Sequence, residues 1–90
     1  MKPESEEVFH YIYKCCRLLD VSMMRVLSKT RVVPIPAKRH AIMISVRHHF
    51  KLTVNEVGKL FERDHSSITH ANRRCSDREQ PAYYYLKLLP

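Results

Sequence analysis

Apolar residues recur along the chain at spacings of three and four, the pattern of amphipathic helices. This pattern predicts a first helix over residues 5–19, capped by Ser5, and a short second helix after Ser22. A third is expected over residues 36–49, because proline is tolerated in a first helical turn. The side chains expected to face inward on these helices are Val8, Ile12, Cys15 and Leu19, then Val21, Met24 and Leu27, then Ile42, Met43, Val46 and Phe50.

Residues 53–78 predict two more helices joined by a short polar turn. Thr53, with Glu56 three residues later, forms a capping box that marks a helix start. Gly58 is the only glycine of the chain. Since glycine inside a helix costs roughly 1 kcal/mol relative to alanine, we expect another helix to approach closely at this point. The inward side chains are Val54, Val57, Leu60 and Phe61 on the first of these helices, and Ile68, Ala71 and Cys75 on the second.

The last segment, residues 79–90, contains the run AYYYLKLLP and predicts one or two further turns. Its tyrosines and leucines can pack on the core or on a second copy of the chain. No segment predicts a convincing strand. The expected fold is therefore all-α, with five or six helices in one domain over residues 1–90.

The outward face of the helix that starts near residue 63 is polar, with arginines at both ends. In a helix-turn-helix the second helix enters the major groove, where short polar side chains contact base edges and arginine binds guanine or phosphate. A polar face opposite an apolar stripe is also what any amphipathic surface helix shows, and Asp64 is equally explained as a helix cap. The residues in question are Arg63, Asp64, His65, Ser66, Ser67, His70, Arg73 and Arg74.

Charge adds weight to the nucleic-acid interpretation. Sixteen Lys and Arg against nine acids give a net charge of +7, and no acid occurs between Arg25 and Lys51. Such a surface suits a polyanion through release of its counterions, although a basic surface can also be inert. Two nearby prolines make residues 28–36 an extended loop, and this loop carries Lys29 and Arg31.

The run VGKLFERDHSSITHA resembles the signature of the C-terminal DNA-binding domain of the bacterial chromosomal replication initiator, DnaA. That signature runs roughly I-G-x-x-F-G-x-R-D-H-[ST]-T-V-x-H-A, and a weaker likeness extends over residues 18–75. The resemblance implies an all-helical, Trp repressor-like domain with a helix-turn-helix and a basic loop. It implies sequence-specific binding of double-stranded DNA, in the regulation of replication initiation or of transcription.

The resemblance also implies roles for individual residues. Base reading in the major groove would fall to Asp64, His65, Ser66 and Ser67, supported by His70. Phosphate contacts would come from Arg39, Arg63 and Arg74. Arg73, on the outward face of the helix that starts near residue 63, is added to this group. The loop with Lys29 and Arg31 would approach the neighbouring minor groove.

Three departures from the family pattern bear on these roles. Ala37 precedes Lys38 where the family commonly places a minor-groove arginine before a proline, which bears on the target sequence. Glu62 stands in the turn where the family often has glycine. No G-x-x-x-x-G-K-[ST] phosphate loop is present. We therefore expect a DNA-reading domain carried alone, not an ATP-driven initiator.

Other chemistries have little support in the sequence. His48 and His49 are adjacent, and Cys15-Cys16 lacks the C-x-x-C spacing of zinc sites, so no metal or cofactor is expected. No nucleophile–base spacing stands out, which argues against an enzyme. Three cysteines imply no disulfide framework, and neither a signal core nor a membrane-length apolar stretch occurs. We expect a cytoplasmic protein that does not contact membranes.

One alternative function stays open. The basic surface or the tyrosine-rich tail over residues 79–90 could bind a protein, as a partner or as a second copy in a homodimer. DNA binding has a steep dependence on salt concentration, so this dependence distinguishes the two functions.

Overall fold

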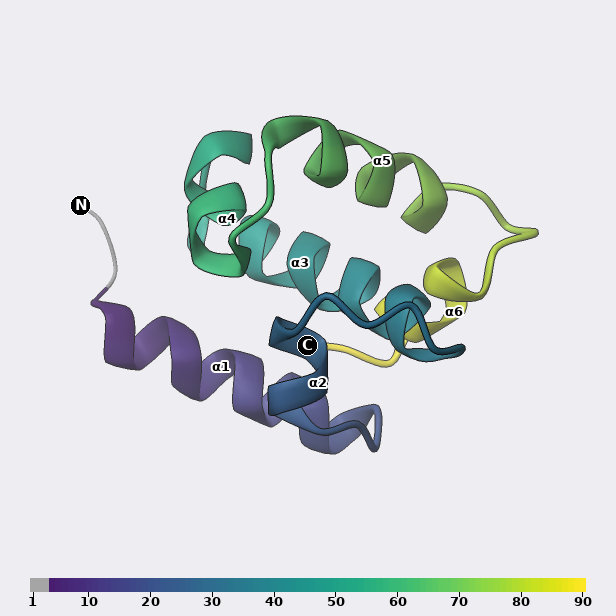
Figure 1. The fold of residues 1–90 in the computed structure, drawn as a ribbon, viewed down its shortest axis with the longest axis horizontal. Helices are drawn as coiled ribbons and strands as arrows, with labels where there is room; N and C mark the ends of the chain where they lie inside the picture. The colour runs from purple at the N-terminus through teal and green to yellow at the C-terminus, as the bar shows by residue number, and fades with distance from the viewer. Residues whose placement is uncertain (1–3) are drawn as a thin grey trace.

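The computed structural model describes residues 4–90. Residues 1–3, the first three of the predicted domain, lie outside the described part. Every regular element in the described part is a helix, so the predicted all-α fold is confirmed (Figure 1). The helices are α1 (Ser5–Leu18), α2 (Met23–Leu27), α3 (Ile35–Phe50), α4 (Val54–Phe61), α5 (His65–Cys75) and α6 (Pro81–Lys87).

Helix α3 is the centre of the fold. It packs against α1, α2, α4, α5 and α6, and Figure 1 shows α1 and α5 on opposite sides of it. Its middle turn is buried on every side: Ile42, Met43, Ile44 and Val46 are buried, and the buried Ser45 hydroxyl bonds to that of Tyr11. A helix that is buried all round must be covered on all faces, and this explains why five helices surround α3.

The first two helices follow the sequence pattern with two exceptions. The predicted stripe of α1 is buried as expected, but Ser5 does not cap the helix. Glu4 occupies the cap position without a side-chain cap bond, and Ser5 is the first helical residue. Met24 was expected to face inward, yet 82% of it is exposed. Helix α2 is barely longer than one turn, and Val26 is its one buried residue. The packing of Val26 therefore decides which side of α2 faces the core.

Both helix starts of the helix-turn-helix are capped as predicted. The Thr53 hydroxyl accepts the backbone N–H of Glu56 at 3.1 Å, and the Glu56 carboxylate accepts the N–H of Thr53 at 2.9 Å. Asp64 caps α5. The inward side of α5 is confirmed, since Ile68, Ala71 and Cys75 are all buried.

Gly58 marks a close approach, but not by another helix. A Cβ atom there would lie 2.6 Å from the carbonyl oxygen of Arg63, in the turn that leads into α5. The Arg63 N–H in turn donates to the carbonyl of Gly58 at 2.7 Å. The turn itself passes through Glu62 with φ of 54°, the left-handed conformation that glycine adopts at least cost.

The tail forms α6 and packs on α3 and α5. Ala82 is buried, and Tyr85, Leu86 and Leu89 pack against the core. Tyr84 and Leu88 are exposed. Most of the apolar surface of this segment therefore contributes to the fold of its own chain. No helix within residues 4–90 has the length and apolar character needed to cross a membrane.

Candidate nucleic-acid interface

Helix α5 presents a continuous polar face. His65, Ser66, Thr69, His70 and Arg73 are exposed along it, while the opposite side of the helix is buried against α3 and α4. Within the described residues, no hydrogen bond engages the side chains of His65, Ser66 or Arg73. Their donors and acceptors are therefore available to a partner that lies along this face.

Asp64 and Ser67 are partly committed to each other. The Asp64 carboxylate accepts the backbone N–H of Ser67 at 3.0 Å and the Ser67 hydroxyl at 3.2 Å. These two bonds, the backbone one first, lower the pKa of Asp64 from its usual value, so it is a carboxylate at neutral pH. The Ser67 hydroxyl retains acceptor capacity. Of the four residues predicted to read bases, Asp64 and Ser67 are therefore bonded to each other, whereas within residues 4–90 the side chains of His65 and Ser66 are unbonded.

The end of the face is stiffened by a chain of hydrogen bonds. Arg74 donates through Nε to Nε2 of His70 at 2.8 Å and through Nη1 to the Gln80 side chain at 3.3 Å. The His70 ring also lies edge-on to His40, with centroids 5.9 Å apart. Arg74 therefore links the end of α5 to the start of α6. His70 is placed to orient Arg74, and its predicted support of base reading stays a prediction.

Two arginines hold the loop between α2 and α3. Arg39, only 5% exposed, donates to the carbonyl oxygens of Val26, Arg25 and Thr30 at 2.7, 3.2 and 3.0 Å. Arg63 donates to the carbonyl oxygen of Ser28 at 2.9 Å. Burial first, and then the neighbouring Arg63 charge, lower the pKa of Arg39. The predicted phosphate contact of Arg39 stays a prediction, but this placement favours a role in shaping the loop.

The loop turns its basic side chains to solvent. Lys29 and Arg31 are exposed, and so are Val32 and Val33 beyond them. Because Arg63 joins this loop to the turn before α5, the loop and the helix-turn-helix are fixed relative to each other. Ala37, in the first turn of α3, packs against the core and offers no donor where the family commonly has an arginine.

His40 adds no positive charge to this region at neutral pH. Burial is the main cause that lowers its pKa to about 4, followed by Arg74, His70, Arg39 and Arg63. The imidazole is therefore neutral at pH 7, and its Nδ1 is buried without a hydrogen-bond partner within the described residues. A charged histidine in this position would repel the arginines that position the loop and the end of α5.

Sequence reasoning missed a second basic group beside the start of α5. A hollow of about 550 Å³ is lined by Arg47 and Lys51, by Asn55 at the start of α4, and by His65 and Thr69 of α5. These groups extend the polar face of α5 across the first turn of α4. The sequence did contain a signal for this group. Lys51 lies just before the capping box, and the N-terminus of a helix attracts anions.

No metal site accompanies this surface. Within residues 4–90, no three histidine, cysteine or acidic side chains gather closely enough to hold a metal ion. Cys15, Cys16 and Cys75 are buried free thiols, and burial raises the pKa of Cys16 and of Cys75 to about 11. These thiols are part of the core.

The comparison with protein families supports the interpretation of this surface. Residues 11–75 match the family model described as the bacterial dnaA protein helix-turn-helix. The chain belongs to this family. The match runs from within α1 to the last residue of α5 and includes the loop between α2 and α3. Searches of curated proteins and of solved structures gave no match. Membership of this helix-turn-helix family supports DNA as a partner of the chain.

Proposed function

We propose that the chain binds a specific sequence in double-stranded DNA, with α5 in the major groove and the loop of residues 28–34 against the adjacent minor groove. The observation that carries this proposal is the exposed face of α5, on which the side chains of His65, Ser66 and Arg73 make no hydrogen bond within the described residues. Side chains with unused donors and acceptors on a rigid helix suit base readout.

The proposed contacts divide by position. His65 and Ser66 enter the groove first and read base edges, together with the acceptor capacity of Ser67 and the carboxylate of Asp64. Phosphates are bound by Arg73 and by the outer nitrogens of Arg74. Arg39 and Arg63 position the loop, and Lys29 and Arg31 are the parts of it that contact DNA.

The family and the charge support a proposal for the biological role. A protein with a net charge of +7 and a DnaA-type helix-turn-helix can occupy initiator-type sites. These 90 residues contain no phosphate-loop motif for ATP hydrolysis. We propose that it regulates replication initiation or transcription by occupying such sites, or by competing for them, without nucleotide hydrolysis.

Binding to duplex DNA at several salt concentrations tests the proposal. Sequences are first selected from a random duplex pool, and the affinity for the selected duplex is compared with that for a scrambled one. We expect a linear fall of log affinity with log salt, with a slope of about −0.9 for each phosphate contact. Absence of binding at low salt would refute the proposal, and would favour the alternative of a protein-interaction module.

Two pairs of variants test the division of roles. His65→Ala and Ser66→Ala should lower the preference for the selected sequence over the scrambled one, because they remove base contacts. Arg31→Ala and Arg73→Ala should weaken binding to both sequences alike and reduce the salt slope by about 1 each. If both pairs gave the same pattern, the division into base-reading and phosphate-binding residues would be wrong.

A further inference from the structure

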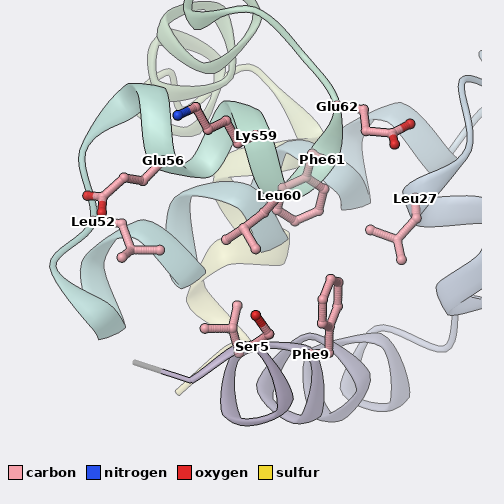
Figure 2. Close-up of a pocket in the computed structure, with 10 residues that line it drawn as sticks. Ser5, Phe9, Leu27, Leu52, Glu56, Lys59, Leu60, Phe61 and Glu62 are labelled. Carbon is pink, nitrogen blue, oxygen red and sulfur yellow. The ribbon is translucent and has the colours of Figure 1, made fainter. Parts of the chain in front are cut away.

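An apolar groove lies between α1 and α4, away from the face of α5. Its volume is about 570 Å³, within the range of roughly 300–1,000 Å³ typical of ligand-binding pockets. Figure 2 shows Phe9 of α1 and Leu60 of α4 pointing into the gap from opposite sides, with Leu52 and Leu27 towards its two ends. The apolar side chains that line it are Val8, Phe9, Leu27, Leu52, Leu60 and Phe61.

The surroundings of this groove are acidic although the chain as a whole is basic. Glu56 and Glu62 lie at its two ends (Figure 2). The adjoining hollow shares Ser5 and Phe9 with the groove and is lined by Glu4, Glu6 and Glu7. Of the nine acids of the chain, two line the groove and three line this adjoining hollow, together with His10. Among the described residues that line the groove, the one cation, Lys59, points away from α1 (Figure 2).

We propose that this groove binds an amphipathic helix of a partner protein, with leucine-like side chains at helical spacing and lysine or arginine on both flanks. The apolar lining accepts the apolar face of such a helix, as in other helix-in-groove complexes. Glu62 at one end and the acids of the adjoining hollow on α1 match its basic flanks. A purely apolar ligand would gain nothing from these carboxylates, and an acidic partner would be repelled by them.

The groove and the DNA surface can be occupied at the same time. Helices α1 and α5 lie on opposite sides of α3 (Figure 1), and none of the groove-lining residues belongs to α5 or to the loop of residues 28–34. The inference thus goes beyond DNA binding and does not depend on it. A partner held here would be carried to the DNA site without covering the reading face.

A designed peptide tests the groove directly. The probe is a short labelled helix with a leucine stripe flanked by lysines, and its binding to the full chain is followed by fluorescence anisotropy. Two comparison peptides have the same length: one carries glutamate in place of lysine, and one has the lysine–leucine composition in scrambled order. We expect the lysine helix to bind at least about tenfold more tightly than either, a difference of about 1.4 kcal/mol.

Two matched variants locate the binding site. Phe9→Arg places a cation in the groove, whereas Tyr13→Arg makes the same change one turn along α1 at an exposed position outside the lining. We expect Phe9→Arg to weaken binding of the lysine helix at least about tenfold, and Tyr13→Arg to leave it unchanged. Both positions are at least 37% exposed, so neither change is expected to prevent folding, and helicity by circular dichroism checks this.

Several outcomes would overturn the proposal. Equal binding of the scrambled or the glutamate peptide would show that helix amphipathicity or the acids are irrelevant. Equal loss in both variants would place binding elsewhere. If ultracentrifugation showed self-association that Phe9→Arg abolishes, the occupant would be a second copy of the chain. DNA affinity of Phe9→Arg should equal that of the parent, so a failure of DNA binding and a failure of this proposal are told apart.

Discussion

Gly58→Ala tests the packing that positions α5, because helix propensity and the structure predict opposite signs. In an ordinary helix interior, alanine is favoured over glycine by roughly 1 kcal/mol, so propensity alone predicts a more stable protein. In this fold the added Cβ would lie 2.6 Å from the Arg63 carbonyl oxygen. We expect the variant to be less stable.

The magnitude follows from what must move. The contact is with backbone, and Arg63 is held by its own N–H bond to Gly58 and by its side-chain bond to Ser28. Overpacking of this kind costs about 1–3 kcal/mol, and the tethers favour the upper part of that range. After the propensity gain, the free energy of unfolding should fall by about 1–2 kcal/mol. For a domain of this size each kcal/mol lowers the melting temperature by roughly 4–8 °C.

Lys59 provides the matched control, since it is the next residue of α4 and is exposed. Urea titrations of Lys59→Ala and Lys59→Gly measure the glycine cost in this helix, and we expect Lys59→Ala to be more stable by about 1 kcal/mol. If Gly58→Ala gained stability by a similar amount, the close approach of the Arg63 carbonyl would be refuted. Under the proposed function, Gly58→Ala should also weaken DNA binding, because α5 must shift to admit the methyl group.

Three further changes test other parts of the structure. Arg39→Gln removes donors to three carbonyls and should lower the free energy of unfolding in urea by about 3 kcal/mol; a salt slope for DNA binding that fell by about 0.9 without loss of stability would instead mark Arg39 as a phosphate contact. Glu62 has a left-handed backbone conformation, which glycine adopts at lower cost. Glu62→Gly should therefore increase the free energy of unfolding by about 1 kcal/mol and raise the melting temperature. Burial lowers the folded-state pKa of His40 to about 4, so the unfolded chain binds the proton first and stability should fall as pH drops from about 6.5 towards 4. His40→Gln should flatten this part of the pH–stability curve, and an unchanged curve would contradict the assigned pKa.

Periodicity and capping predicted the parts of the fold that depend on local sequence. The buried stripe of α5, Ile68, Ala71 and Cys75, follows from 3.6 residues per turn, and the cap at Thr53 follows from side-chain chemistry three residues away. The prediction that Met24 faces inward was wrong, because a helix of five residues has too few positions to define a face. Gly58 predicted a close neighbour, but a glycine says nothing about which backbone comes near.

Long-range contacts set the limit of prediction at the candidate site. The family resemblance implied a phosphate contact for Arg39, which stays a prediction. Its three carbonyl acceptors lie 9 to 14 residues away, in α2 and in the loop after it, and no local pattern encodes this packing. The acid-bordered groove was missed for a similar reason. Phe9 lies off the inward stripe of α1, and only the packing of α1 beside α4 makes it part of a shared apolar surface.

The family signature carries information about geometry as well as about the side chains proposed to read DNA. Gly58 and Arg63 build the turn and fasten the loop to it, and Asp64 starts the reading helix. These matches explain why α5 stands where it does, and any chain that shares them should share the placement. Under the proposed function, the choice of target falls to His65 and Ser66, whose side chains make no hydrogen bond within the described residues, and to the loop before Ala37, a position that lacks the arginine common in the family. Because His65 and Ser66 also match the signature, Ala37 is the departure that bears on the target, and it favours the same docking with an altered minor-groove contact.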